Sequence, residues 1–93
     1  MINVCVNVFV KQNDGPYYLM KEIFDNHYIK AYDAEEYIKW FVKTKCNYSR
    51  EFEPCIDIDE IKKLENESSY VTHEYDFPDD DGNIYHLIVN FYS

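Results

Sequence analysis

The sequence predicts an α+β fold: an antiparallel sheet of four to five strands with two helices packed on one face. Apolar and polar residues alternate near both ends of the chain, which is the period-2 pattern of β-strands. Capping patterns in the middle of the chain indicate helices. We expect one domain over residues 1–93, because so short a chain supports one core. The expected order is strand, strand, an optional third strand, helix, helix, strand, strand.

The N-terminal third predicts a hairpin. Residues 2–10 carry valine or isoleucine at every even position, so one face of this strand is apolar. The turn sequence Asn-Asp-Gly-Pro at 13–16 leads into residues 17–23, where aromatic and β-branched residues favour a second strand. Residues 27–31 are the candidate for the optional third strand.

The first helix is expected to begin at Asp33, whose carboxylate can cap it while Glu36 completes a capping box. Its apolar stripe consists of Ala34, Tyr37, Ile38, Phe41 and Val42. Residues 47–54 lack a consistent period, so we expect a loop there. Asp57 then caps a second helix, whose thin apolar stripe is Ile58, Ile61 and Leu64. We therefore expect the second helix to be short and weakly anchored.

The C-terminal part predicts a second hairpin around the turn at 78–82. In the strand before this turn, one face carries Val71, His73, Tyr75 and Phe77, and the other carries Thr72, Glu74 and Asp76. In the strand after it, Tyr85, Leu87, Val89 and Phe91 share one face. Two strands with such alternation can each place one face on the core.

Charge is distributed unevenly along the chain, whose net charge is −9. Residues 1–50 hold seven basic and six acidic side chains, whereas residues 51–93 hold two basic and twelve acidic ones. A field of this sign repels nucleic acid and attracts basic surfaces. We therefore expect a basic protein partner and no direct binding of nucleic acid. Solubility alone is the alternative explanation of a negative charge, but solubility does not require a one-sided distribution.

The sequence carries no pattern typical of an enzyme. The only two glycines, Gly15 and Gly82, lie in expected turns, so no glycine loop is available to hold a phosphate. No local signature around a cysteine supports nucleophilic catalysis. Carboxylates for acid–base chemistry are present, but in expected exposed turns and helix faces. We expect a binding protein and not an enzyme.

Metal binding is the main chemical alternative. Cys46 and Cys55 flank the expected loop and would bring two thiolates to a tetrahedral structural zinc site. We expect His73 as the third ligand, with Cys5, His27 and His86 as further candidates. The competing interpretation is that the cysteines are small buried apolar groups and that His73 is a core residue.

The chain has no apolar stretch of membrane-spanning length, and its beginning alternates in place of a signal-peptide core. Its three cysteines are an odd number at irregular spacing, which is unlike the disulfide framework of a small secreted domain. We therefore expect a cytoplasmic protein that makes no contact with a membrane.

The short length, the abundance of tyrosine, the neutral first half and the acidic run from Glu51 to Asp81 resemble small acidic inhibitors encoded by phages and mobile elements. Among these, the chain is most similar to anti-CRISPR proteins directed at type II RNA-guided nucleases. The resemblance is one of overall profile and includes no motif. It implies an inhibitor that binds a basic nucleic-acid-binding surface of the effector nuclease and blocks loading of guide RNA or target DNA.

The carboxylates of the second half are the expected partner-binding residues. They are Asp57, Asp59, Glu60, Glu65, Glu67, Glu74, Asp76, Asp79, Asp80 and Asp81. An antitoxin, immunity or adaptor protein that neutralises another basic partner would use the same surface, and a zinc-stabilised interaction domain is a further alternative. The sequence does not determine the target or the oligomeric state.

Overall fold

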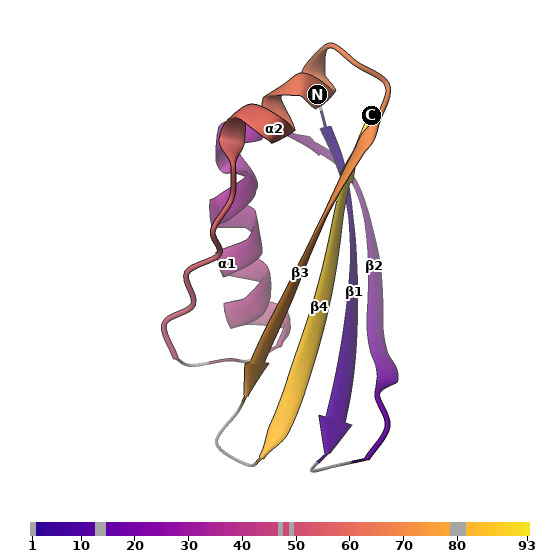
Figure 1. Ribbon diagram of the computed structural model, residues 1–93, viewed down its shortest axis with the longest axis vertical. Coiled ribbons are helices and arrows are strands. Elements are labelled where there is room, and N and C mark those ends of the chain that lie inside the picture. The colour runs from indigo at the N-terminus through magenta and orange to yellow at the C-terminus, as the bar shows by residue number, and fades with distance from the viewer. Residues whose placement is uncertain (1, 13–14, 47, 49, 79–81) are drawn as a thin grey trace.

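The computed structural model describes residues 2–12, 15–46, 48, 50–78 and 82–93, and for residues 20–28 it describes the backbone. The fold is an α+β arrangement of one four-stranded antiparallel sheet and two α-helices (Figure 1). Its elements are β1 (Ile2–Gln12), β2 (Tyr18–Ile29), η1 (Ala31–Asp33), α1 (Ala34–Lys45), α2 (Ile58–Lys62), η2 (Lys63–Glu65), β3 (Tyr70–Pro78) and β4 (Asn83–Tyr92).

The sheet has the strand order β2-β1-β4-β3, so the first and last strands of the chain form its centre. Pairing of β1 with β4 runs without interruption from Asn3 opposite Tyr92 to Gln12 opposite Asn83. The β1–β2 pairing contains two register irregularities, one of them between Val8 and Phe9. The β1–β2 and β3–β4 hairpins, which the helices separate in sequence, thus become one sheet through the pairing of β1 with β4.

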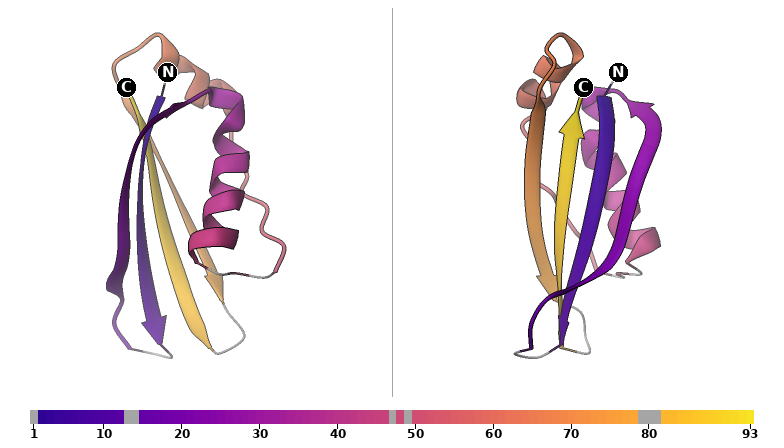
Figure 2. Two further views of the ribbon diagram at one scale, coloured as in Figure 1. Left: turned by 180° about the vertical axis from the view of Figure 1, so that it is seen from behind. Right: turned by 90° about the vertical axis from the view of Figure 1, so that its right-hand side faces the viewer.

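The two faces of this sheet have different surroundings. Figure 2 shows α1 along one face, with α2 near the sheet end where the two termini lie. We call this the covered face. On the other side, which we call the outer face, no described helix lies against the strands (Figure 2).

The covered face carries the hydrophobic core. The even-numbered residues of β1 lie opposite the odd-numbered residues of β4, so the two alternating apolar sets meet on one side. The fully buried side chains of this core include Val4, Val6, Ile38, Phe41, Ile61, Leu87, Val89 and Phe91. The helices contribute the stripes expected from the sequence: Ala34, Ile38, Phe41 and Val42 are buried in α1, and Ile61 and Leu64 in α2 and η2.

Two expectations about local structure are corrected. Residues 27–31 do not form a separate third strand, because β2 is continuous to Ile29, η1 begins at Ala31 and the sheet has four strands. Asp33 is the N-cap residue of α1 but makes no side-chain capping bond, since the preceding η1 already winds the chain into a helical turn. The second helix is short, as expected: it has five α-helical residues before it tightens into η2.

Asp57 caps α2 as expected: its Oδ1 accepts a hydrogen bond of 3.0 Å from the Asp59 backbone N–H. No helix in the described residues is long and apolar enough to cross a membrane.

Candidate binding surface

The structure places seven of the ten expected partner-binding carboxylates, and all seven residues are exposed. Five of them form what we call the α2 acidic group: Asp57, Asp59, Glu60, Glu65 and Glu67. The other two, Glu74 and Asp76, form the β3 acidic pair. Asp79, Asp80 and Asp81 lie outside the described residues. The expected acidic surface is therefore resolved into two groups on different elements.

The α2 acidic group lies on a short helix that is anchored by its own carboxylates. Asp57 caps α2, and Glu65 Oε1 accepts a 3.4 Å hydrogen bond from the backbone N–H of Ala31. Lys30 lies close by; a hydrogen bond with Tyr32 chiefly raises the pKa of this ammonium group, and the charges of Asp33 and Glu65 act in the same direction. Asp57 and Glu65 thus have structural roles, whereas Asp59 and Glu60 are exposed in the first turn of α2 and Glu67 is exposed after η2.

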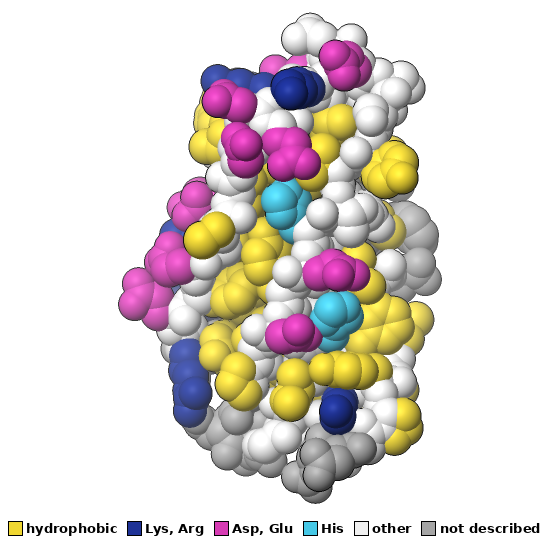
Figure 3. All heavy atoms as spheres, viewed as in Figure 1, with side chains coloured by type: hydrophobic (Ala, Val, Ile, Leu, Met, Phe, Trp, Pro, Cys, Tyr) yellow, Lys and Arg dark blue, Asp and Glu magenta, His cyan; other side chains and the backbone are white. Residues whose placement is uncertain are grey.

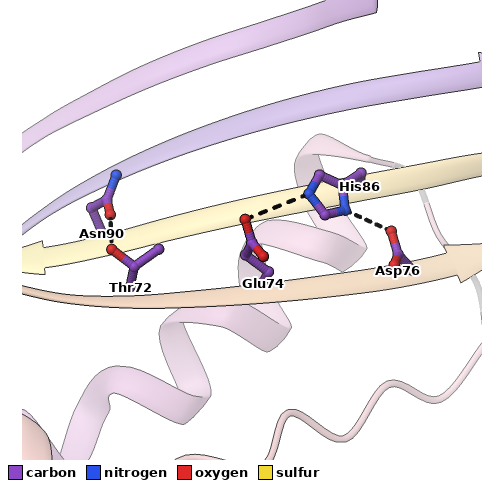
Figure 4. A network of polar contacts seen from close by, with 5 residues as sticks. All are labelled: Thr72, Glu74, Asp76, His86 and Asn90. Carbon is purple, nitrogen blue, oxygen red and sulfur yellow. Dashed lines mark hydrogen bonds and ion pairs between the residues drawn. The ribbon is translucent and has the colours of Figure 1, made fainter. Parts of the chain in front are cut away.

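The β3 acidic pair projects from the outer face, because Glu74 and Asp76 lie opposite Ile88 and His86 of β4. The imidazole of His86 is held between the two carboxylates (Figure 4). Its Nδ1 is 2.6 Å from Asp76 Oδ1, and its Nε2 is 3.8 Å from Glu74 Oε1. On the same face, Thr72 donates a hydrogen bond to the Asn90 side chain.

Aromatic rings lie next to this imidazole. The ring centroids of Tyr17 and Phe9 are 5.7 and 6.4 Å from that of His86, and the Lys11 ammonium is 5.4 Å from the Tyr17 centroid. We call Phe9, Tyr17, Glu74, Asp76 and His86 the outer-face cluster. It joins β1, β3, β4 and the segment before β2. Aromatic rings beside carboxylates are a combination that suits an arginine side chain.

Further apolar side chains surround the outer-face cluster. Leu19 lies opposite Phe9 and is 50% exposed, Tyr17 is 45% exposed, and Ile84 and Ile88 are partly buried on β4. At the other end of the same face, Tyr70 and Tyr92 lie opposite each other, and Tyr70 is 72% exposed. In Figure 3, hydrophobic and acidic side chains adjoin one another over the strands. The outer face is therefore a mixed aromatic and acidic surface.

The expected zinc ligands are not brought together. Cys46 ends α1 and is buried in the core cluster, whereas Cys55 is exposed. His73 stacks on Tyr75, with ring centroids 6.2 Å apart. Within the described residues, no group of three His, Cys, Asp or Glu side chains is placed to hold a metal ion. The physical reason is that Cys46 belongs to the apolar stripe that faces the sheet.

Two polar atoms on the covered side lack a hydrogen-bond partner among the described residues, namely His73 Nε2 and Tyr75 Oη. The pKa of Tyr75 is raised to about 12, mainly by burial and to a smaller extent by the charges of Cys55 and Glu35. Phe52 packs edge-on against the Tyr75 ring, with centroids 5.5 Å apart. The covered side therefore contains buried polar groups without a described hydrogen-bond partner, next to the loop that precedes α2.

A cleft of about 360 Å³ lies between α1 and the same loop. Its lining consists of Lys39, Val42, Lys43, Tyr48, Arg50, Glu51, Phe52 and Glu53. The Lys39 ammonium lies 3.2 Å from Glu53 and 3.3 Å from Glu35. These contacts, with the Glu53 hydrogen bond as the largest cause, raise the pKa of Lys39. The ion pairs join the loop to α1, and the cleft is part of that junction.

No family model matches the chain, and neither a curated protein nor a solved structure matches it.

Proposed function

We propose that this protein is a small acidic inhibitor that binds a basic nucleic-acid-binding surface of a type II CRISPR effector nuclease. By occupying that surface, it blocks loading of the guide RNA or the target DNA. In this proposal the protein acts by stoichiometric binding in the host cytoplasm, without catalysis and without contacting nucleic acid itself. The observation that carries the proposal is the exposure of all seven described carboxylates among the expected contact residues.

The physical argument rests on competition for the same cations. An RNA-guided nuclease holds its heteroduplex in a positively charged channel, through contacts to the phosphate backbone. Carboxylates form charge-assisted hydrogen bonds with the lysine and arginine side chains that bind phosphate. A chain with a net charge of −9, most of it in the second half, is attracted to such a channel before contact. The exposed aromatic residues add apolar contact area once the surfaces meet.

The direct test is DNA cleavage by a purified type II RNA-guided nuclease. The protein is added before the guide RNA, after the guide RNA, or after the target DNA. We expect inhibition that is strongest when the protein is added before the nucleic acid whose loading it blocks. Inhibition that does not depend on the order of addition would contradict the loading mechanism. Absence of inhibition in every order would contradict the choice of target.

A charge-reversal pair tests the electrostatic basis. The variant Asp59→Lys/Glu60→Lys/Glu67→Lys changes three exposed acids of the α2 acidic group that have no capping role in the described structure. A matched control, Asp33→Lys/Glu36→Lys/Glu51→Lys, makes the same change in charge at three exposed acids elsewhere. We expect the first variant to inhibit less than the control, with both retaining the thermal unfolding transition of the wild type. Equal inhibition by the two variants would reject a defined acidic contact surface.

An antitoxin, immunity or adaptor protein would use the same carboxylates against another basic protein. Retention of a basic toxin or host enzyme on the immobilised protein, combined with an inactive result in the nuclease assay, would favour this alternative.

A further inference from the structure

The outer face presents apolar and aromatic side chains that no helix of the described residues covers. Antiparallel sheets commonly expose one face to water, and the side chains on that face are usually polar. Here the side chains on the outer face include Phe9, Ile84 and Ile88, and Tyr17 and Leu19 extend the apolar area. Exposed apolar area with a polar border is typical of an interaction surface.

The charges on this face favour a cationic partner. Glu74 and Asp76 lie together on β3, and the imidazole that now lies between them leaves carboxylate acceptor sites unused, because an ionised carboxylate has about four. Tyr17 and Phe9 contact the same imidazole, Phe9 from the β1 side, and the Lys11 ammonium lies 5.4 Å from the Tyr17 centroid. A second copy of the chain is disfavoured as the occupant, since it would also carry a net charge of −9 and the same acidic pair.

We propose that the outer-face cluster binds an arginine side chain from an extended basic segment of a partner protein. The guanidinium would donate hydrogen bonds to one or both carboxylates of the β3 acidic pair through its planar set of N–H groups. Its flat face would lie against the ring of Tyr17 or Phe9. Lysine fits this position less well, because its ammonium cannot stack and does not pair with a carboxylate through two parallel hydrogen bonds.

This inference rests on the proposed function, to which it adds a contact surface and a partner chemistry. It adds the outer face to the contacts that the α2 acidic group makes in that proposal. It also assigns a positioning role to His86, whose Nδ1 lies 2.6 Å from Asp76 Oδ1 and holds that carboxylate in place before the partner arrives. Pre-organised carboxylates lose less conformational entropy on binding than mobile ones.

The test uses two fluorescent nine-residue peptides as probes, one alternating arginine with serine and the other alternating lysine with serine. Binding is measured by fluorescence anisotropy at low and at physiological salt. We expect the wild-type chain to bind the arginine peptide more tightly than the lysine peptide. The variant Glu74→Gln/Asp76→Asn keeps the shape of both side chains and should weaken the arginine complex by about tenfold, as loss of charge-assisted hydrogen bonds predicts.

The matched control is Glu36→Gln/Glu51→Gln, which removes the same charge from two exposed acids outside the expected contact residues. We expect it to keep the affinity within about twofold, the range of a distant exposed charge. Tyr17→Ser should reduce the preference for arginine over lysine while preserving much of the salt-dependent attraction. Amide chemical shifts recorded during titration should move on β1, β3 and β4 around the outer-face cluster. Circular dichroism melting curves establish that each variant is folded.

The outcomes separate the two proposals. Loss of binding in the control but not in Glu74→Gln/Asp76→Asn would overturn the outer-face inference while leaving an acidic inhibitor in place. Equal binding of the two peptides would overturn the arginine assignment. No peptide binding, together with sedimentation as a dimer that Ile88→Lys dissociates, would show instead that the outer face joins two copies. Failure of the nuclease assay concerns the proposed target and leaves the peptide result unaffected.

Discussion

The covered and outer faces of the sheet are built from the same strands, yet their side chains differ in kind. On the covered face, Val4, Val6, Leu87, Val89 and Phe91 are all 0% exposed. On the outer face, the neighbouring positions carry amides, carboxylates, a histidine and partly exposed apolar groups. Because the covered face supplies the core, the side chains of the outer face are not needed for it and can take part in recognition.

The largest expected effect is on the covered face. Phe91→Ala should lower the free energy of unfolding by about 3–5 kcal/mol, because it removes a fully buried ring and leaves a cavity. Ile88→Ala, on the outer face of the same strand, should cost about 1 kcal/mol or less, because its side chain is only partly buried. Urea denaturation of both variants measures the difference.

A small loss in Phe91→Ala, or equal losses in the two variants, would contradict the assignment of a single core to the covered face. If the slope of the unfolding free energy against urea concentration is unchanged in both variants, the two variants differ in stability alone.

The covered face could be predicted from the sequence because its signal is local. Even-numbered valines in residues 2–10 and the odd-numbered apolar set of residues 85–91 identify the buried side of each strand. The same reasoning predicted the cap at Asp57, where the capping bond forms. It was wrong about the capping bond at Asp33, because η1 precedes α1 and the sequence pattern does not distinguish such a turn from a start that a side chain caps.

The outer-face cluster could not be predicted in the same way. Its members lie at positions 9, 17, 74, 76 and 86, and only the strand order β2-β1-β4-β3 brings them together. The available signal was an aromatic or histidine at the non-core positions of the alternating segments, notably Phe9 and His86. Reading those positions requires the register of β1 with β4, which places Phe9 opposite His86.

Tyr75 brings a polar hydroxyl to the covered face, whose other strand residues are mostly apolar. Its hydroxyl oxygen is buried, and its pKa is raised to about 12 against about 10 in an unfolded chain. Below about pH 10 both states keep the proton, and the contribution to stability is fully present. As the pH rises from about 10 to 12, the unfolded chain loses this proton first, so stability falls.

We therefore expect Tyr75→Phe to be less sensitive than the wild type to that rise in pH, as measured by thermal unfolding across the range. At neutral pH the variant should match or slightly exceed the wild type, since it removes a buried hydroxyl that has no hydrogen-bond partner in the described structure. Tyr70→Phe is the matched control, because Tyr70 is 72% exposed. An identical pH response in the two variants would place the Tyr75 hydroxyl in water.

The smallest expected effect lies on the outer face, where exposed charges contribute little to stability. Asp76→Ala removes the carboxylate 2.6 Å from His86 Nδ1 and should lower the free energy of unfolding by about 1 kcal/mol or less. This loss should shrink at high salt, because exposed ion pairs are screened. Thr72→Ala, on the same face of β3, removes the neutral hydrogen bond to Asn90, so its effect should not depend on salt.

Urea denaturation at low and high salt distinguishes the two variants. A large, salt-independent loss in Asp76→Ala would mean that the fold depends on the His86 contact, and the outer face would then be structural. A small, salt-sensitive loss would mean that these carboxylates contribute little to the folded state. The close placement of Glu74 and Asp76 around the His86 imidazole would then favour a role in binding. Side chains that stabilise a fold only weakly can exchange a contact within the protein for a contact with another protein.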